Sequence, residues 1–342
     1  LVIFLAFLAV SEAFKTDSVA EFLSRPAPAF VSKLRGQDLA DYVNAVQPFF
    51  RANYSKASEE RAKQLMQLDT VVPNGKILTT TTVPDIPESF DAREKWPFCK
   101  SLGFIHDQSA CGSCWAVSGA STMSDRLCIQ TKGKDQTLLS DADLVSCCHA
   151  CNPAGGCNGA WPYFAWQYVM TNGICSGGYP EDENVCKPYP FLPCEPHVGQ
   201  PHSPCPADGY KTPACKLECQ SSYKTKYQND KHYAESAYYM PAGDVKSIQT
   251  EIMTHGPVQA VFIVYSDFPL YKKGIYVPTP GAKEIGKHAI KIIGWGVENN
   301  TPYWLIANSY NLDWGEGGYF RMVRGYNAGN IEGWVSAGMM KA

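Results

Sequence analysis

A closely spaced pair of cysteines, Cys111 and Cys114, is the first feature of this sequence that could do chemistry. A zinc site would need a second pair at ribbon spacing, and the cysteines at 147–151 are too crowded to supply it. A redox dithiol usually has its tryptophan before the first cysteine and lies in a βαβ unit, whereas Trp115 follows the second cysteine here. The sequence therefore favours the third possibility, a nucleophilic thiolate.

Two residues far downstream could activate such a thiol. His288 opens an expected strand, and Asn308 stands twenty residues later at the end of another. A thiol has a pKa of about 8.5, so a thiolate in acid needs a helix N-terminus or an imidazolium beside it. An amide that accepts from the ring N–H would fix the orientation of the imidazole. Cysteine, histidine and asparagine in this order predict a catalytic triad.

The run Cys-Gly-Ser-Cys-Trp resembles the local signature of papain-like thiol peptidases, in which the second cysteine is the nucleophile. The whole of 86–342 is similar to the cathepsin B branch of that family. Five segments carry the likeness: Ile86–Trp96, Gly156–Gly159, Asp230–Tyr233, Val264–Phe268 and Gly294–Pro302. His288 follows Cys114 by 174 residues, against about 130–150 in papain-like enzymes. The surplus fits an insertion at 186–219, which in this branch contains the occluding loop over the primed end of the cleft.

The resemblance implies a role for each site residue. Cys114 would attack the peptide carbonyl, His288 would protonate the leaving amine, and Asn308 would orient the imidazole. Gln108 and the backbone N–H of Cys114 would form the oxyanion hole. Four further residues would contact substrate, namely Gly159, His197, Trp314 and Trp334. The resemblance implies no metal and no other cofactor.

Several positions depart from the pattern of the branch. Pro196 replaces the first of two adjacent histidines that bind a substrate's C-terminal carboxylate, and only His197 remains, so we expect substantial endopeptidase activity. Tyr310 stands where a tryptophan usually shields the Asn–His hydrogen bond, and 109–110 replaces the usual Gly-Ser. Trp334 replaces an acid at the base of the S2 pocket, so we expect apolar or aromatic P2 residues to be preferred over arginine.

Hydrophobic periodicity predicts the elements that position these residues. We expect helices at 113–130, after an N-cap at Ser140, at 161–171 and at 245–254, and strands at 258–265, 288–293, 303–307 and 319–323. Helices followed by strands indicate an α+β fold. The resemblance makes this a disulfide-rich, papain-like fold of two lobes, one helical and one β-barrel-like, with the active-site cleft between them.

The N-terminal part of the chain differs in composition from the rest. Residues 1–10 are apolar but too short for a membrane span, and small residues follow at 11 and 13, so we interpret 1–13 as a signal peptide truncated at its start. Residues 14–85 contain no cysteine and carry a helical pattern from Leu39 to Phe50. We expect 14–85 to be an inhibitory pro-segment and 86–342 to be the mature peptidase domain.

Fourteen cysteines indicate an oxidising compartment, a metal site or both. The resemblance pairs twelve of them, as Cys99–Cys128, Cys111–Cys157, Cys147–Cys215, Cys148–Cys151, Cys186–Cys219 and Cys194–Cys205. Cys175 is left over beside the nucleophile, and we expect it to be a small buried hydrophobic residue. Asn53 and Asn299 are possible glycosylation sites.

Charge and similarity narrow the partners. The net charge is −3 and no block of Lys or Arg stands out, so the sequence points away from nucleic acid and membrane partners. We expect a secreted or lysosomal monomer that binds protein or peptide substrates, its own pro-segment and cystatin-type inhibitors. Residues 303–316 are similar to a stretch in gut cathepsin B-like enzymes of blood-feeding nematodes, whose substrates include haemoglobin. The alternative is a catalytically weak relative acting as a secreted binding protein or antigen.

Overall fold

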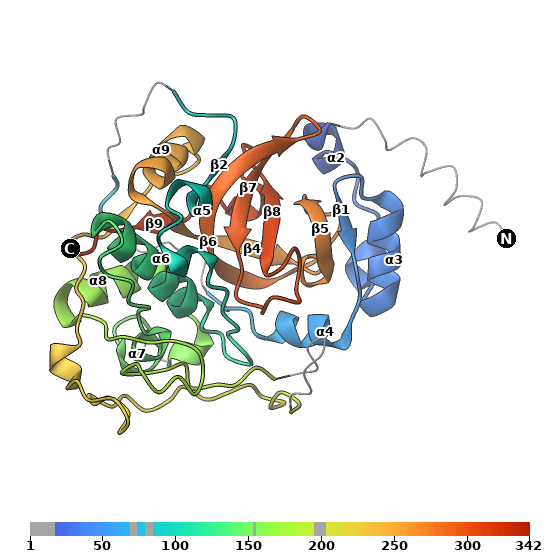
Figure 1. Ribbon diagram of the computed structural model, residues 1–342. Coiled ribbons are helices and arrows are strands. Elements are labelled where there is room, and N and C mark those ends of the chain that lie inside the picture. The colour runs from blue at the N-terminus through green and yellow to red at the C-terminus, as the bar shows by residue number, and fades with distance from the viewer. Residues whose placement is uncertain (1–17, 69–73, 79–84, 153–154, 195–202) are drawn as a thin grey trace.

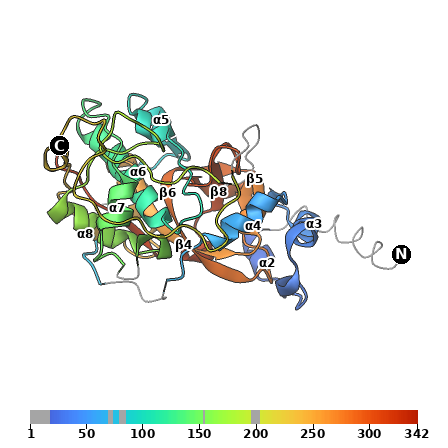
Figure 2. The ribbon, with the colours of Figure 1, turned by 90° about the horizontal axis from the view of Figure 1, so that it is seen from below.

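The computed structural model describes residues 18–68, 74–78, 85–152, 155–194 and 203–342 (Figure 1). The expected signal peptide, Pro196 and His197 lie outside these residues. Two lobes lie side by side, one built around the helix α6 and the other around a large sheet (Figures 1 and 2). This arrangement confirms the predicted α+β fold of two lobes.

The helical lobe is organised around α6, Cys114–Gln130, which is buried over nearly its whole length. Helices α7, Asp141–Cys147, and α8, Pro162–Asn172, pack against it. The side chain of Ser140 caps α7 by accepting from the backbone N–H of Asp143 at 3.0 Å, as the sequence predicts. Proline at the first position of α8 is favourable because the missing N–H would have no helical partner.

The other lobe is a twisted sheet in the order β1-β5-β8-β7-β6-β4-β9-β3. Its long strands are β4 (Val258–Tyr265), β5 (Tyr271–Tyr276), β6 (Glu284–Glu298), β7 (Thr301–Ala307) and β8 (Tyr319–Val323). The short ones are β2 (Phe90–Asp91), β3 (Tyr238–Tyr239) and β9 (Val335–Ala337), and β2 pairs with β6. Strand β6 is longer than expected because β4 and β7 both pair with it.

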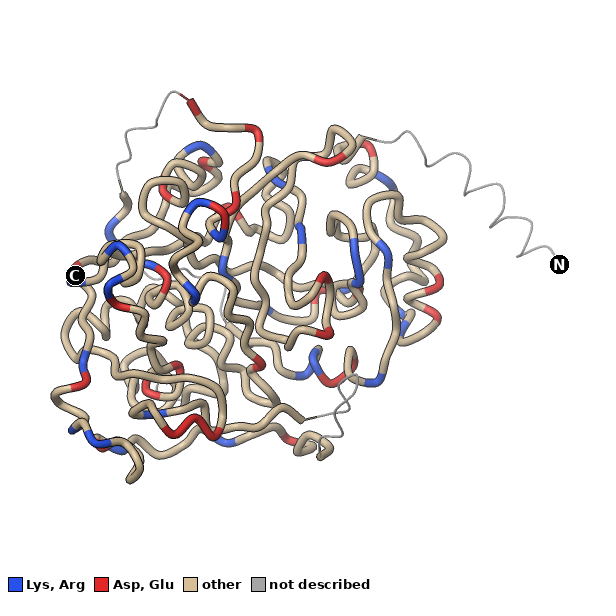
Figure 3. The backbone as a smooth tube through the Cα atoms, viewed as in Figure 1, with Lys and Arg blue, Asp and Glu red and all other residues tan. Residues whose placement is uncertain are grey.

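Smaller elements complete the fold. Helix α5 is Ala92–Lys95, and α9, Val245–His255, packs against β6 and β4. The 3₁₀ turns are η1 Val31–Lys33, η2 Lys100–Gly103, η3 Gly156–Asn158, η4 Tyr227–Asn229, η5 Phe268–Leu270 and η6 Ala328–Asn330. Within the described residues, none of the helices combines the length and apolar character that a bilayer span requires. Basic and acidic positions are interspersed along the chain (Figure 3).

Buried ion pairs join the two lobes. Lys291 of β6 donates to Asp125 of α6 at 2.6 Å, and both side chains are almost fully buried. Arg126 of α6 pairs with Glu251 of α9 at 2.9 Å. Helix α6, which begins at Cys114, is therefore fixed to β6 by one ion pair and to α9 by the other.

The N-terminal segment packs against the β lobe. It contains α2 (Val19–Leu23), α3 (Gly36–Val46), β1 (Phe50–Ala52) and α4 (Lys56–Lys63). Helices α2 and α3 lie on the outer side of the β lobe, and α4 lies nearer the helical lobe (Figures 1 and 2). Strand β1 extends the sheet by pairing with β5.

The predicted helical pattern was wrong at its end. The helix stops at Val46, and Phe50 begins β1 instead of continuing the helix. The Asn44 side chain bonds both backbone groups of Ala52 at 2.9 Å, which turns the chain back, and Gln47 bonds the carbonyl of Val277. These long-range bonds outweigh the local periodicity.

The structure contains six disulfides, in the pairing that the resemblance implied: Cys99–Cys128, Cys111–Cys157, Cys147–Cys215, Cys148–Cys151, Cys186–Cys219 and Cys194–Cys205. Cys175 is free and fully buried. Burial raises the pKa of its thiol, with the Asp143 carboxylate adding to the effect. Cys175 is thus a neutral thiol inside the core.

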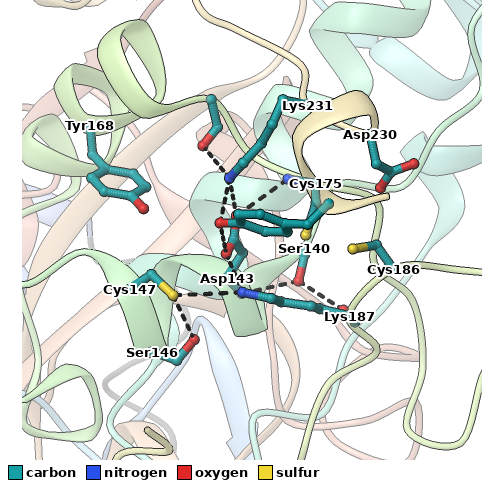
Figure 4. A network of polar contacts seen from close by, with 12 residues as sticks. Ser140, Asp143, Ser146, Cys147, Tyr168, Cys175, Cys186, Lys187, Asp230 and Lys231 are labelled. Atoms are coloured by element: carbon teal, nitrogen blue, oxygen red, sulfur yellow. Dashed lines mark hydrogen bonds and ion pairs between the residues drawn. The ribbon is translucent and has the colours of Figure 1, made fainter. Parts of the chain in front are cut away.

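A polar network anchors the cysteine-rich segment, which is the insertion expected at 186–219, to α7 (Figure 4). Asp143 accepts from the ammonium groups of Lys187 at 2.7 Å and Lys231 at 2.8 Å, and from the Tyr227 hydroxyl at 2.8 Å. Burial alone would raise the pKa of Asp143, but Lys231 and Lys187 hold it below its usual range. The carboxylate is therefore ionised, and it joins α7 to Lys187 and to the stretch that carries Tyr227 and Lys231.

Candidate active site

Cys114 is the first residue of α6 and is fully buried. The N-cap residue, Ser113, makes no side-chain cap, so the N-terminal partial charge of the helix is directed at the residues of the first turn. The backbone N–H of Ala289 lies 3.4 Å from the Cys114 sulfur. This contact brings the strand that carries His288 against the thiol.

His288 and Asn308 meet although they belong to different strands. Nε2 of His288 lies 2.7 Å from Oδ1 of Asn308, which directly follows β7. The amide oxygen can only accept, so Nε2 carries the proton. Nδ1 of His288 is buried and has no hydrogen-bond partner among the described residues. That nitrogen is thus available to the thiol, and the structure brings the three predicted triad residues together.

Both reactive groups are neutral in this form of the protein. Burial raises the pKa of the Cys114 thiol to about 12. Burial also lowers the pKa of His288 to about 4, although the hydrogen bond with Asn308 opposes that effect. An ion pair of thiolate and imidazolium needs more polar surroundings than this closed cleft provides.

Aromatic rings enclose the imidazole. Tyr310, which replaces the usual tryptophan, stacks on His288 with ring centroids 4.8 Å apart and an angle of 20° between the planes. Asn308 is only 5% exposed, so the bond between Asn308 and His288 is shielded despite the substitution. Trp314 is 3% exposed and packs edge-on against Tyr310 at 5.5 Å. In this form Trp314 is a core residue, and its predicted contact with substrate stays a prediction for an opened cleft.

Gln108 is held in place by several bonds. Its amide donates to the carbonyl of Cys111 at 2.9 Å, and its side-chain oxygen accepts from the Ser309 hydroxyl at 2.7 Å. The same amide nitrogen lies 3.4 Å from the carbonyl oxygen of Gln64, in the N-terminal segment. A backbone carbonyl of the N-terminal segment therefore occupies the donor expected to stabilise an oxyanion.

The N-terminal segment continues through the cleft as extended chain. Met66 exchanges two backbone hydrogen bonds of 2.9 Å with Lys287, directly before His288. Gly159 faces Met66 so closely that a Cβ at position 159 would lie 2.8 Å from the methionine side chain. The φ of Gly159 is +94°, which also favours glycine. Both features explain why glycine is needed where peptide runs past this wall.

A cavity of about 820 Å³ remains between the segment and the helical lobe. Gln64, Leu65, Gln67 and Leu68 line one side, and residues 157–161 and 205–210 line the other. Trp334 stands near this wall, with its ring packed edge-on against Trp161 at 5.5 Å. Trp334 therefore has an aromatic neighbour, and its place at the base of the S2 pocket stays a prediction.

Sequence reasoning missed several residues that shape the site. The Tyr189 hydroxyl, from the cysteine-rich segment, donates to the carbonyl of Gln108 at 2.7 Å and lies 2.6 Å from the Ser113 hydroxyl. Arg61 of α4 pairs with Asp313 at 3.3 Å. Nothing local in the sequence marks these contacts, because their partners are 76 to 252 residues away. Asn53 and Asn299 are both exposed, as glycosylation would require.

Comparison with known proteins agrees with this geometry. Residues 86–339 match the family described as papain family cysteine protease. The chain is 46% identical over 311 residues to cathepsin B-like cysteine proteinase 4 of Caenorhabditis elegans, covering 89% of this chain and 92% of the relative. It is 51% identical over 257 residues to a cathepsin B-like cysteine proteinase of Schistosoma japonicum, covering 75% and 74%. A gut-specific cysteine proteinase of Caenorhabditis elegans is 43% identical over 316 residues, covering 91% and 92%.

Solved structures are also similar. Procathepsin B S9 from Trypanosoma congolense matches with a TM-score of 0.74 and 33% identity, covering 88% of this chain and 97% of that one. Digestive procathepsin L2 from Tenebrio molitor larval midgut has a TM-score of 0.63 at 23% identity, which supports the fold alone. The assembled thiol, imidazole and amide, together with the family match, show that the chain belongs to the papain family of cysteine proteases, in its cathepsin B-like branch.

Proposed function

We propose that the protein is the zymogen of a secreted or lysosomal cysteine endopeptidase, with 14–85 as its inhibitory pro-segment and 86–342 as the mature enzyme. The observation that carries the proposal is the path of residues 64–68 through the cleft. The Gln64 carbonyl lies at the amide of Gln108, and Met66 pairs with Lys287. Substrate cannot reach Cys114 while this segment is in place.

In the mature enzyme, Cys114 and His288 act as a thiolate–imidazolium pair. Attack of the thiolate on a peptide carbonyl forms an oxyanion that Gln108 and the backbone N–H of Cys114 stabilise. His288 then protonates the leaving amine, and water hydrolyses the acyl-enzyme. Asn308 keeps the imidazole in the orientation that these transfers need.

The test is labelling with a thiol-directed epoxide. The intact protein should react slowly at neutral pH, and the acid-treated, reduced protein should gain one label on Cys114. Cys114→Ala is the control for reaction at other thiols, including Cys175. A protein that loses its N-terminal segment yet gains no label would support the alternative, a catalytically weak binding protein or antigen.

A digestive role is the finer part of the proposal. A relative named a gut-specific cysteine proteinase is 43% identical over most of both chains, which supports it. Haemoglobin or another dietary protein is then the expected substrate, and cystatin-type proteins are the expected inhibitors. Immunolocalisation to the gut lumen supports this role, whereas restriction to a tissue with no digestive function contradicts it.

The preference at P2 follows from Trp334. An aromatic wall without an acid offers no countercharge to arginine, so apolar or aromatic P2 residues should be cleaved faster. Specificity constants for matched Phe and Arg peptides test this preference. Trp334→Glu should lower the ratio of the specificity constant for the Phe peptide to that for the Arg peptide. A wild-type enzyme that already prefers Arg at P2 would contradict the proposal.

A further inference from the structure

Lys287 is a nearly buried cation. Its contacts with the N-terminal segment are lost if that segment is removed on activation. The residue is 5% exposed and directly precedes His288 in β6. Its ammonium group donates to the carbonyl oxygen of Leu68 at 2.7 Å, and its backbone pairs with Met66. Among the described residues, no carboxylate lies within ion-pair distance of Lys287. Lysine is seldom buried without a charged partner, so the position is unusual.

A second lysine on the same strand shows what a satisfied cation looks like here. Side chains alternate along a strand, so Lys287 and Lys291 lie on the same face of β6. Lys291 bonds Asp125 at 2.6 Å and the Ser121 hydroxyl at 2.7 Å. Lys291, in the interface between the lobes, has the Asp125 carboxylate as its partner. Lys287 has only the backbone carbonyl of Leu68, which belongs to the segment that leaves on activation.

Departure of residues 64–68 exposes that difference. The ammonium group then loses the carbonyl oxygen of Leu68, its hydrogen-bond acceptor in this structure. A cation that is partly excluded from water and lacks an acceptor is unfavourable. A carboxylate satisfies it better than a carbonyl does, because hydrogen bonds between charged groups are shorter and stronger.

We propose that Lys287 determines specificity in the mature enzyme by binding an acidic side chain of the substrate close to the scissile bond. The inference rests on the proposed zymogen function, since Lys287 becomes available only when the segment leaves. The two backbone bonds with Met66 show that extended peptide can run along this edge of β6. An Asp or Glu of a substrate that runs along β6 as Met66 does can reach the ammonium group that now donates to the carbonyl of Leu68.

The neighbouring wall acts in the same direction. Trp334 and Trp161 place aromatic rings beside the cleft, and Trp334 offers no countercharge to a cationic side chain. Lys287 repels such a side chain as well. Acidic and apolar residues of the substrate near the scissile bond are therefore both favoured. Basic residues are disfavoured by the missing countercharge at Trp334 and by repulsion from Lys287.

The test uses matched peptides with the protein that has been activated from the full chain. The peptides of each set differ only by Asp, Asn or Lys at one position from P3 to P2′, and kcat/KM is measured for the wild type, Lys287→Gln and Lys287→Glu. At one position the wild type should favour Asp by about tenfold, the effect of one charge-assisted hydrogen bond. Lys287→Gln should bring that ratio close to one, and Lys287→Glu should favour Lys over Asp at the same position.

Lys283→Gln is the matched control, because it removes the same charge from an exposed residue just before β6. Its Asp-to-Asn ratio should stay at the wild-type value. Cleavage of the Lys peptide by Lys287→Glu would also show that the reversed variant is folded. An active wild type with equal rates for Asp and Asn at every position, or a ratio unchanged in Lys287→Gln, overturns the inference alone. Absence of any cleavage by the wild type overturns the proposed function and the inference with it.

Discussion

Acidification should open the cleft in part by protonating His288. The imidazole is fully buried in this closed form, and burial lowers its pKa from 6.5 to about 4. A group with a lower pKa in the closed form binds fewer protons there than in the open form. Its contribution to closure is therefore present above pH 6.5 and is lost as the pH falls from 6.5 towards 4.

The size of the effect follows from the same values. One pKa unit corresponds to about 1.4 kcal/mol, so charging His288 costs the closed form roughly 3 kcal/mol. The population of open molecules should then rise roughly 100-fold between pH 7 and pH 4 from this group alone. Acidic side chains of the N-terminal segment add their own contributions, so the test must isolate the histidine.

Hydrogen exchange in an inactive background provides that test. Cys114→Ala prevents autoprocessing and removes the thiolate, which would otherwise raise the pKa of His288 in the open form. The amide of Met66, which bonds the carbonyl of Lys287 at 2.9 Å, reports on opening. Opening free energies obtained from its exchange should fall with pH in Cys114→Ala and fall much less when His288→Asn is added.

Equal pH profiles in the two backgrounds would refute the reasoning. Such a result would mean that carboxylates of the segment, and not the catalytic histidine, sense the acid. A profile that reaches its midpoint well above pH 6.5 would also refute it, because an imidazole with a lowered pKa cannot titrate there.

Three further changes test separate contacts. Arg61→Gln breaks the pair with Asp313, in which the two side chains are 10% and 21% exposed. We expect the free energy that holds the N-terminal segment in place to fall by about 1 kcal/mol, and epoxide labelling of the intact protein at neutral pH to become about fivefold faster. Gln108→Ala removes an oxyanion donor, so kcat of the mature enzyme on a peptide should fall by about 10²–10³ with little change in KM. Asp143→Asn leaves two lysines without their carboxylate and should lower the free energy of unfolding by about 3 kcal/mol in denaturant titration.

Each of these changes has its own control and contradiction. Glu59→Gln changes an exposed residue of the same helix whose side chain bonds Tyr54 within the segment, so its labelling rate should stay near that of the wild type. A KM effect without a kcat effect in Gln108→Ala would place that side chain in substrate binding only. Asp208→Asn alters an exposed carboxylate, and equal stability losses at positions 143 and 208 would contradict the role of the network.

Local signals predicted the helical lobe and the central strands well. Helix α6 begins one residue after the predicted start, and Ser140 caps α7, because caps and apolar periodicity act within a few residues. The prediction failed where distant partners decide the structure. Phe50 lies in β1 and not in a helix, because β5 offers backbone bonds that the local pattern cannot reveal.

The types of the site residues could be predicted from the sequence, but the contacts that support Gln108 and close the cleft could not. The order and spacing of Cys114, His288 and Asn308 predicted a triad, and the structure places these three residues at one site. No local pattern indicates that Tyr189 supports Gln108, or that the carbonyl of Gln64 lies at the proposed oxyanion donor. These contacts arise only when the N-terminal segment, the cysteine-rich segment and the two lobes have come together.

One measurement tests the central claim most directly. The acid-activated, reduced protein is incubated with a long peptide, and the products are identified by mass spectrometry, with Cys114→Ala as the control. The account predicts loss of the N-terminal segment near residue 85, internal cuts in the peptide by the wild type, and no cuts by the variant. Cutting by Cys114→Ala, or an intact peptide after the segment has gone, would contradict it.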